Sequence, residues 1–425
     1  MKFFKIIILA LCFSFFNNNA SAQNHDSLYF FIDAPLFEYP FNTESKYATV
    51  SMDQSIKLTK SFYYTTHFGI ELFGRKRLGK NGDFWSKVIM SVFDFAPIPL
   101  SNTWLHEEFH RAPLALYNID SKNTHWSNSV KGVKDEDLVR LKSESPEDMV
   151  RAATSGNEGN LEYVFSMQKD AFFGDVNTWN YGLYWGNYLV NSFYLFGSTR
   201  EGSKPLVRFK NRENEDILKR DANGYDPINA TYDLFNQFED YTARGIHPSG
   251  VGIDRYVEFN DLSLDAQQFL KNQFALSFLN FVDLNLFGID QVGKRTQFNF
   301  SLRHHMTSFG SMVGGNLLFK NEKFGGMISP KLFSNNEKRF LGIDIELRNK
   351  WGMLKVAGWQ QPENQLYFDM GKKLGGLIEL TIAPPLKNIL PYLDLSLKSD
   401  GWVAGNPYLE NNFTFRIGTR FKFKE

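Results

Sequence analysis

From about residue 272 to the end of the chain, apolar and polar residues alternate with a period of two, which is the pattern of β-strands. The clearest segment is the last one, where one face carries Phe413, Phe415, Ile417, Thr419, Phe421 and Phe423. Its other face carries Thr414, Arg416, Gly418, Arg420 and Lys422. Segments 298–303 and 341–348 alternate in the same way. Because no helical pattern separates these strands, we expect them to pair antiparallel and in sequence order.

A strand with one apolar and one charged face fits two environments. Its apolar face packs on a protein core, or it contacts lipid while the charges line the lumen of a barrel. The expected strands are long, roughly eight to ten in number, and the last ends on Phe421 and Phe423. In these features residues 272–425 resemble the outer-membrane β-barrels of diderm bacteria. The resemblance implies an antiparallel barrel, or a barrel-like sheet, in contact with outer-membrane lipid; the alternative is a soluble sandwich or half-barrel in the periplasm.

The first residues have the composition of an export signal. Lys2 and Lys5 precede an apolar run over 6–16, and Ala20-Ser21-Ala22 forms an A-x-A cleavage site. We therefore expect a signal peptide over 1–22 and a mature chain in the cell envelope. The chain's single cysteine, Cys12, lies in this signal, so the mature protein has no disulfide and no cysteine metal ligand. A lipoprotein acceptor role for Cys12 is less favoured, because Leu11 before it is bulky.

Residues 23–270 are predicted to form a mostly helical domain, ahead of the strand-rich domain over 271–425, which makes the chain α+β. The uncharged stretch 179–198 contains three asparagines and three glycines, so we interpret it as a buried or interfacial helix. Residues 200–262 are charged and rich in turns, and no role is assigned to them. Lysine plus arginine and aspartate plus glutamate balance at 47 each, which argues against a nucleic-acid partner.

A short motif in the helical part carries chemistry. His106, Glu107 and His110 form H-E-x-x-H, in the segment HEEFH. Residues four apart lie on one face of an α-helix, so both imidazoles can reach one metal ion. The motif helix is expected to begin near residue 102 and to close near 112, because Pro113 removes a backbone donor. Glu108 is expected to face away from the metal.

The motif resembles that of the zincin metallopeptidases, and more loosely that of the gluzincins, whose third zinc ligand is a glutamate on a later helix. That resemblance implies a zinc centre, Glu107 as general base, and a peptide or protein substrate. For the third ligand Glu158 is preferred, on a helix that we expect to begin at Ser145-Pro146. Glu162 and His125 are the alternatives.

Residues Tyr63, Tyr64 and Tyr163 are candidate donors to an oxyanion, and nothing in the sequence selects among them. The main alternative to an enzyme is a non-enzymatic outer-membrane barrel, porin-like or structural, in which the H-E-x-x-H match is fortuitous. Metal binding separates the two interpretations.

Overall fold

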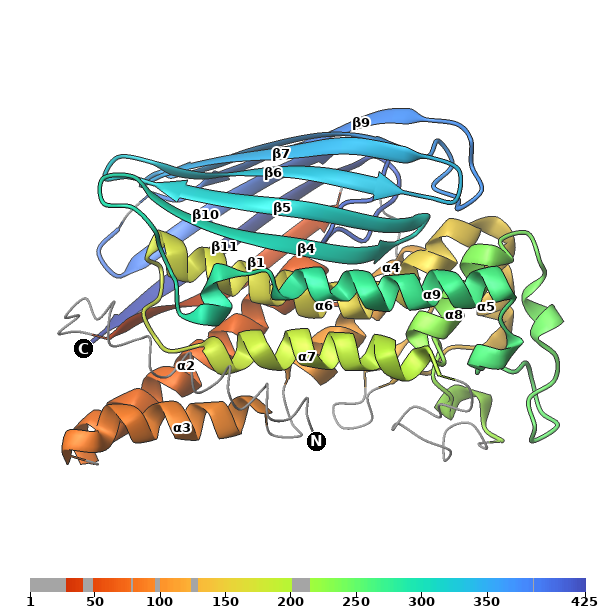
Figure 1. Ribbon diagram of the computed structural model, residues 1–425, viewed down its shortest axis with the longest axis horizontal. Coiled ribbons are helices and arrows are strands. Elements are labelled where there is room, and N and C mark those ends of the chain that lie inside the picture. The colour runs from red at the N-terminus through yellow and green to blue at the C-terminus, as the bar shows by residue number, and fades with distance from the viewer. Residues whose placement is uncertain are drawn as a thin grey trace.

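The computed structural model describes residues 28–40, 49–77, 79–95, 100–123, 129–200, 215–384 and 386–425. Its long helices are α2 (Met52–Arg77), α3 (Gly82–Phe95), α4 (His106–Leu116), α5 (Asp135–Glu144), α6 (Pro146–Phe173), α7 (Tyr181–Ser198), α8 (Asp226–Phe235) and α9 (Leu264–Ser277). The strands of its large sheet are β1 (Tyr29–Pro40), β4 (Gln297–Thr307), β5 (Gly310–Lys320), β6 (Gly325–Ser334), β7 (Arg339–Asn349), β8 (Gly352–Gln361), β9 (Lys373–Ile382), β10 (Ile389–Lys398) and β11 (Asn412–Lys424). The protein is α+β, with a helical layer beside one antiparallel sheet (Figure 1).

The large sheet is open. Its strand order is β1-β11-β10-β9-β8-β7-β6-β5-β4, so β1 and β4 form the two edges. The expectation of a closed barrel is therefore wrong, while sequential antiparallel pairing of the C-terminal strands is confirmed. Helix α2 packs along β1, and α9 packs along β4, so helices cover the edges that a barrel would pair with each other. The sheet also takes β1 from the segment predicted to be helical.

The face of the sheet toward the helices carries charged residues, beside apolar residues such as Leu318 and Met327 that cluster with Phe165 and Phe172 of α6. Helix α6 packs against the face that carries charges, and Lys169 of α6 lies 3.2 Å from the Glu346 carboxylate of β7. The opposite face is apolar in register across eight strands. One cross-strand row on that face runs through Phe300, Leu317, Ile328, Ile345, Val356, Ile378, Leu397 and Phe413.

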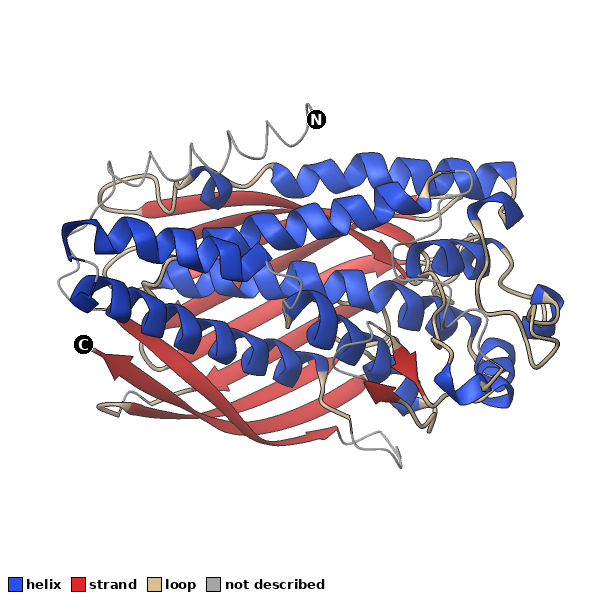
Figure 2. Cartoon of the chain, turned by 90° about the horizontal axis from the view of Figure 1, so that it is seen from below, coloured by secondary structure: helices blue, strands red, loops and turns tan. Residues whose placement is uncertain are grey.

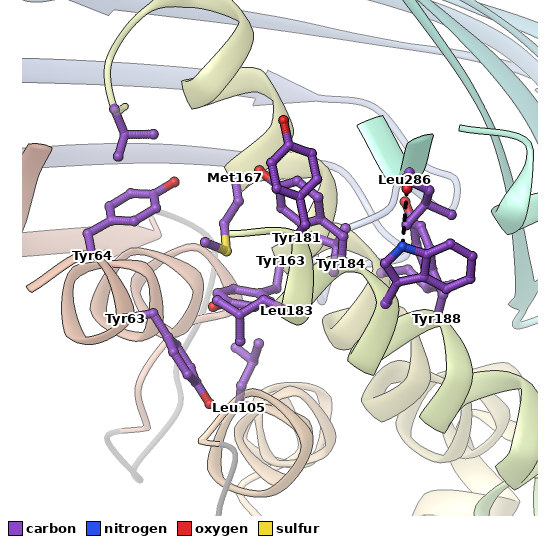
Figure 3. Close-up of a cluster of buried hydrophobic side chains, with 14 of the residues drawn as sticks. Tyr63, Tyr64, Leu105, Tyr163, Met167, Tyr181, Leu183, Tyr184, Tyr188 and Leu286 are labelled. Atoms are coloured by element: carbon purple, nitrogen blue, oxygen red, sulfur yellow. Dashed lines mark hydrogen bonds between the residues drawn. The ribbon is translucent and has the colours of Figure 1, made fainter. Parts of the chain in front are cut away.

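The helical layer lies across the strands (Figure 2) and has its own aromatic core (Figure 3). Tyr63, Tyr64 and Tyr163 belong to this buried cluster, together with Leu105 at the start of the motif helix. The Trp185 indole donates to the backbone oxygen of Leu286, 3.1 Å away, and ties α7 to the segment ahead of β4. The tyrosines proposed as oxyanion donors therefore lie within the core of the helical layer.

Several local predictions agree with the structure. Helix α6 begins at Pro146, with Ser145 at its N-cap position, and residues 181–198 form the mostly buried α7. No described helix combines the length and the apolar character that a single membrane crossing requires. The predicted signal peptide, with Cys12, falls outside the described residues.

The motif helix differs from its prediction at both ends. A π-helical turn over Ser101–Leu105 precedes α4, and α4 continues past Pro113 to Leu116. Leu114 is fully buried in a second cluster that includes Leu138 and Leu141 of α5, and Ala115 is also buried. Burial of these apolar side chains outweighs the one backbone hydrogen bond that Pro113 removes.

Candidate metal centre

The H-E-x-x-H residues lie in the first turns of α4, which the core holds from both sides. Leu105 and Phe109 are both fully buried in the aromatic core. Phe109 also packs on Gly159 of α6, where an added Cβ would lie 2.7 Å from the phenyl ring. Gly159 thus lets α4 and α6 approach closely, and the motif histidines point into the contact between the two helices.

Three donor atoms meet at this contact. The Nε2 atoms of His106 and His110 are 3.1 Å apart. The Oδ2 atom of Asp226 lies 3.0 Å from Nε2 of His106 and 3.3 Å from Nε2 of His110. All three residues are buried, and among the described residues they are the cluster of histidine and carboxylate side chains able to hold a metal ion.

The backbone around Asp226 explains how a residue so distant in sequence reaches the motif. Asp226 is the first residue of α8, and Pro227 follows it, a placement that suits the opening of a helix. Gly224 just before has φ of +60°, and a Cβ there would lie 2.1 Å from the Arg255 backbone oxygen. The glycine at position 224 therefore allows the turn that places the Asp226 carboxylate beside the two histidines.

A second glycine makes room for the histidines. A Cβ on Gly156 of α6 would lie 2.3 Å from Nε2 of His110 and 2.5 Å from Nε2 of His106. Such distances are well inside van der Waals contact. The α6 backbone at Gly156 therefore forms one wall of the site.

Second partners orient the donor groups. The Nδ1 of His110 donates to the backbone oxygen of Ala152 at 2.6 Å, which leaves its Nε2 lone pair directed at the cluster. The Tyr194 hydroxyl, on α7, donates to Oδ2 of Asp226 at 3.1 Å. Such outer hydrogen bonds fix tautomer and ring orientation in metal sites.

Burial and mutual charge shift the protonation of the cluster. Burial lowers the pKa of His106. Burial also acts to lower the pKa of His110, but the adjacent Asp226 carboxylate outweighs it and raises that pKa to about 9. The two imidazoles in turn hold the pKa of Asp226 below its usual value, against the effect of burial. The Asp226 carboxylate and the His110 imidazolium thus stabilise each other's charge, and a divalent cation would stabilise the carboxylate in place of that proton.

The two glutamates of the motif have different surroundings. Burial, reinforced by the charge of Asp221, raises the pKa of Glu107 well above its usual value. Burial, together with the Asp226 charge, raises the pKa of Asp221 itself to about 7. Glu108 is turned away, as predicted, and its two oxygens accept from the Arg111 guanidinium at 2.7 and 2.8 Å. Glu107 is therefore the motif carboxyl held in the site.

The structure places Glu158 apart from the histidines. Both of its carboxylate oxygens accept from Arg151, at 2.7 and 2.8 Å, and one also accepts from the Gly405 backbone N–H. The Glu158 carboxylate thus links α6 to the β10–β11 loop. The carboxylate that joins the two histidines is that of Asp226 instead. Two other residues were alternatives for the third ligand. The Oε1 atom of Glu162 lies 3.3 Å from Nε2 of His305 on β4, and His125 falls outside the described residues.

Sequence reasoning missed Asp226, Tyr194 and Asp221. Asp226-Pro227 after a glycine is a recognisable helix start, so the segment 224–227 carried a local signal. That signal locates a helix and gives no information about its neighbours. Comparison with protein-family models, with curated proteins and with solved structures finds no match to this chain.

Proposed function

We propose that this protein is a zinc-dependent hydrolase that cleaves peptide bonds. The observation that carries the proposal is the triangle of donor atoms, with sides of 3.0, 3.1 and 3.3 Å. Metal–ligand bonds of about 2.0–2.1 Å in tetrahedral geometry separate the ligand atoms by about 3.3 Å. Three protein ligands leave the fourth position for water, as catalytic zinc requires.

The roles of the surrounding residues follow from their positions. His106, His110 and Asp226 would hold zinc, which supplies a water of pKa about 7 and polarises a carbonyl. Glu107 would take a proton from the attacking water at its carboxylate and return it to the leaving amine, as a general base and then a general acid. The Tyr194 hydroxyl, which donates to Asp226, would hold that carboxylate in the orientation of a metal ligand.

The metal centre is tested by elemental analysis of the detergent-purified protein. We expect about one zinc per chain in the wild type, loss of zinc in His106→Ala and Asp226→Asn, and retention in Glu107→Gln. Glu158→Gln is the matched control, because it changes a buried carboxylate that the structure places on Arg151. Zinc that survives in Asp226→Asn but is lost in Glu158→Gln would refute the site.

Peptide hydrolysis has its own test. We would incubate the zinc-loaded wild type with a degenerate peptide library and map the cleaved bonds by mass spectrometry, with Glu107→Gln as the inactive control. Cleavage by the wild type alone is the expected result. A zinc-loaded wild type that leaves every peptide intact, but turns over another carbonyl substrate, would exclude the peptidase and keep the hydrolase.

For localisation we propose the outer membrane, with lipid in contact with the apolar face of the sheet. The supporting observation is the polarity of the sheet: charged residues meet α6 on the inner face, and the row from Phe300 to Phe413 lies outward. Strands of 10 to 13 residues measure about 33–44 Å, long enough to cross a bilayer core when tilted. Purified protein that stays monodisperse without detergent would refute lipid contact.

The same observations weaken the porin alternative. Helix α6 packs on the charged face of the sheet, where a porin would have its water-filled lumen. The sheet therefore serves better as a carrier for the helical layer than as the wall of a channel.

A further inference from the structure

The helical layer has an apolar surface of its own, on α3. Trp85, Ile89 and Val92 are spaced at i, i+4 and i+7, so they lie on one face of the helix. Val92 is 68% exposed and Trp85 48% exposed, and Phe84 and Phe95 at the two ends of α3 are also exposed. Figure 1 shows α3 on the side of the helical layer away from the sheet.

The α2–α3 pair buries one set of polar contacts, while the Asp83–Lys87 ion pair of α3 lies at the surface. His67 of α2 is fully buried, with its Nε2 2.8 Å from Oδ1 of Asp94 on α3. Its Nδ1 lies 2.9 Å from the side-chain oxygen of Asn180. The α2–α3 pair thus buries an ionisable contact and exposes aromatic and branched side chains, as the sheet does with its charged and apolar faces.

The charged end of this helix pair indicates what covers the surface. Helix α2 ends on Arg75, Lys76 and Arg77, directly ahead of α3. Basic side chains beside an exposed tryptophan, followed along the helix by apolar residues, match the order of headgroup, interface and acyl chain in a bilayer. Glu71 and Glu425 lie 3.6 Å from Arg75 and 2.6 Å from Lys76, so these three cations leave one positive charge that is complementary to lipid phosphate.

The sheet repeats this arrangement at the same end of the molecule. Lys76 lies 2.6 Å from the carboxylate of Glu425, just past the end of β11, so the end of α2 lies beside the end of that strand. The tight turn between β7 and β8 is toward this end too, because the register runs from Gly352 through Ile382 and Leu393 to Ile417, and β11 continues from there toward Glu425. That turn holds Lys350 with the exposed Trp351, whose ring lies 5.5 Å from the lysine nitrogen.

We propose that the exposed face of α3 is a second lipid-contact surface, on the side opposite to the sheet, and that the basic ends of both surfaces sit at one layer of phospholipid headgroups. The inference rests on the proposed membrane localisation and extends it. Helices α2 and α3 then form part of the lipid-facing perimeter that strands would complete in a closed barrel.

Spin labels test the proposal, since Cys12 is the only cysteine and Cys12→Ser leaves a thiol-free background. We would label Val92→Cys, with Ile89→Cys as a second reporter one turn away, in the full chain reconstituted into phosphatidylethanolamine–phosphatidylglycerol vesicles. Glu136→Cys, exposed on α5, is the water-facing control, and Ile343→Cys reports on the sheet. Collision of each label with oxygen, which concentrates in lipid, is compared with collision with a water-soluble nickel chelate.

We expect the oxygen-to-nickel ratio at 89, 92 and 343 to exceed that at 136 by several-fold. If 343 reports lipid while 89 and 92 match 136, the α3 proposal fails and the sheet remains in the membrane. If 343 also matches 136, the membrane localisation fails with it. Labels at 89 and 92 that are shielded from both reagents would mean that protein covers α3, for example a second copy, and this too overturns the proposal.

Discussion

Substitution of Gly156 by alanine gives the sharpest test of the metal centre. Because alanine is the better helix former, the change should favour α6 by about 1 kcal/mol if nothing else were affected. The new Cβ, however, would stand 2.3 Å from Nε2 of His110 and 2.5 Å from Nε2 of His106. Each distance is about 1 Å or more inside van der Waals contact, so both imidazoles must move away from the position that faces Asp226.

The expected consequence is a loss of zinc affinity without a loss of fold. Since the shift disturbs two of three ligands, we expect the dissociation constant to rise by more than about 100-fold, or more than about 2.7 kcal/mol. Competition with a chromogenic zinc chelator measures it, and circular dichroism checks that the helices remain. Gly69→Ala is the matched control, because Gly69 lies within α2 and an added Cβ there meets nothing within 4 Å.

Two outcomes would refute this reasoning. If Gly156→Ala binds zinc within about threefold of the wild type while His106→Ala does not bind it, the histidines hold the metal on a face that α6 does not approach. If Gly69→Ala loses zinc as Gly156→Ala does, the effect is a general one of alanine in these helices and says nothing about the site.

Three further predictions address other parts of the molecule. Tyr194→Phe should raise the dissociation constant for zinc by about 10-fold or more, because it removes the hydrogen bond that orients the Asp226 carboxylate; competition with a zinc chelator measures it, and an unchanged affinity would exclude that role. Ile345→Lys, on the outward face of β7, should cost about 2–4 kcal/mol in lipid, whereas an exposed position in water tolerates lysine within about 0.5 kcal/mol; urea titration in lipid vesicles decides between the two. Burial and the Glu410 charge raise the pKa of Asp148 to about 8. The free energy of unfolding should therefore fall as pH rises from about 4 to 8, and at pH 9 Asp148→Asn should have a larger free energy of unfolding than the wild type.

What the sequence predicts well is local. The alternation along 413–423 and 341–348 predicts β11 and β7, since successive residues of a strand point to opposite faces of the sheet. The Ser145-Pro146 start of α6 and the shared helix face of His106 and His110 are of the same kind. Closure of the sheet into a barrel cannot be predicted from local patterns. It depends on whether β1 pairs with β4 or each edge is covered by a helix, and the sequence of neither strand indicates which.

The third ligand shows the same limit more sharply. Glu158 lies on α6, near the right turn and two residues from Gly156, so by sequence spacing it was a reasonable choice. Its orientation on the helix takes it instead to the buried Arg151, a residue seven positions earlier. Asp226 reaches the histidines because Gly224 turns the chain and α8 packs on α6, and its resulting contact with His106 spans 120 residues of sequence. A two-histidine motif fixes the helix that carries it, but the carboxylate that completes the site is chosen by how the helices pack.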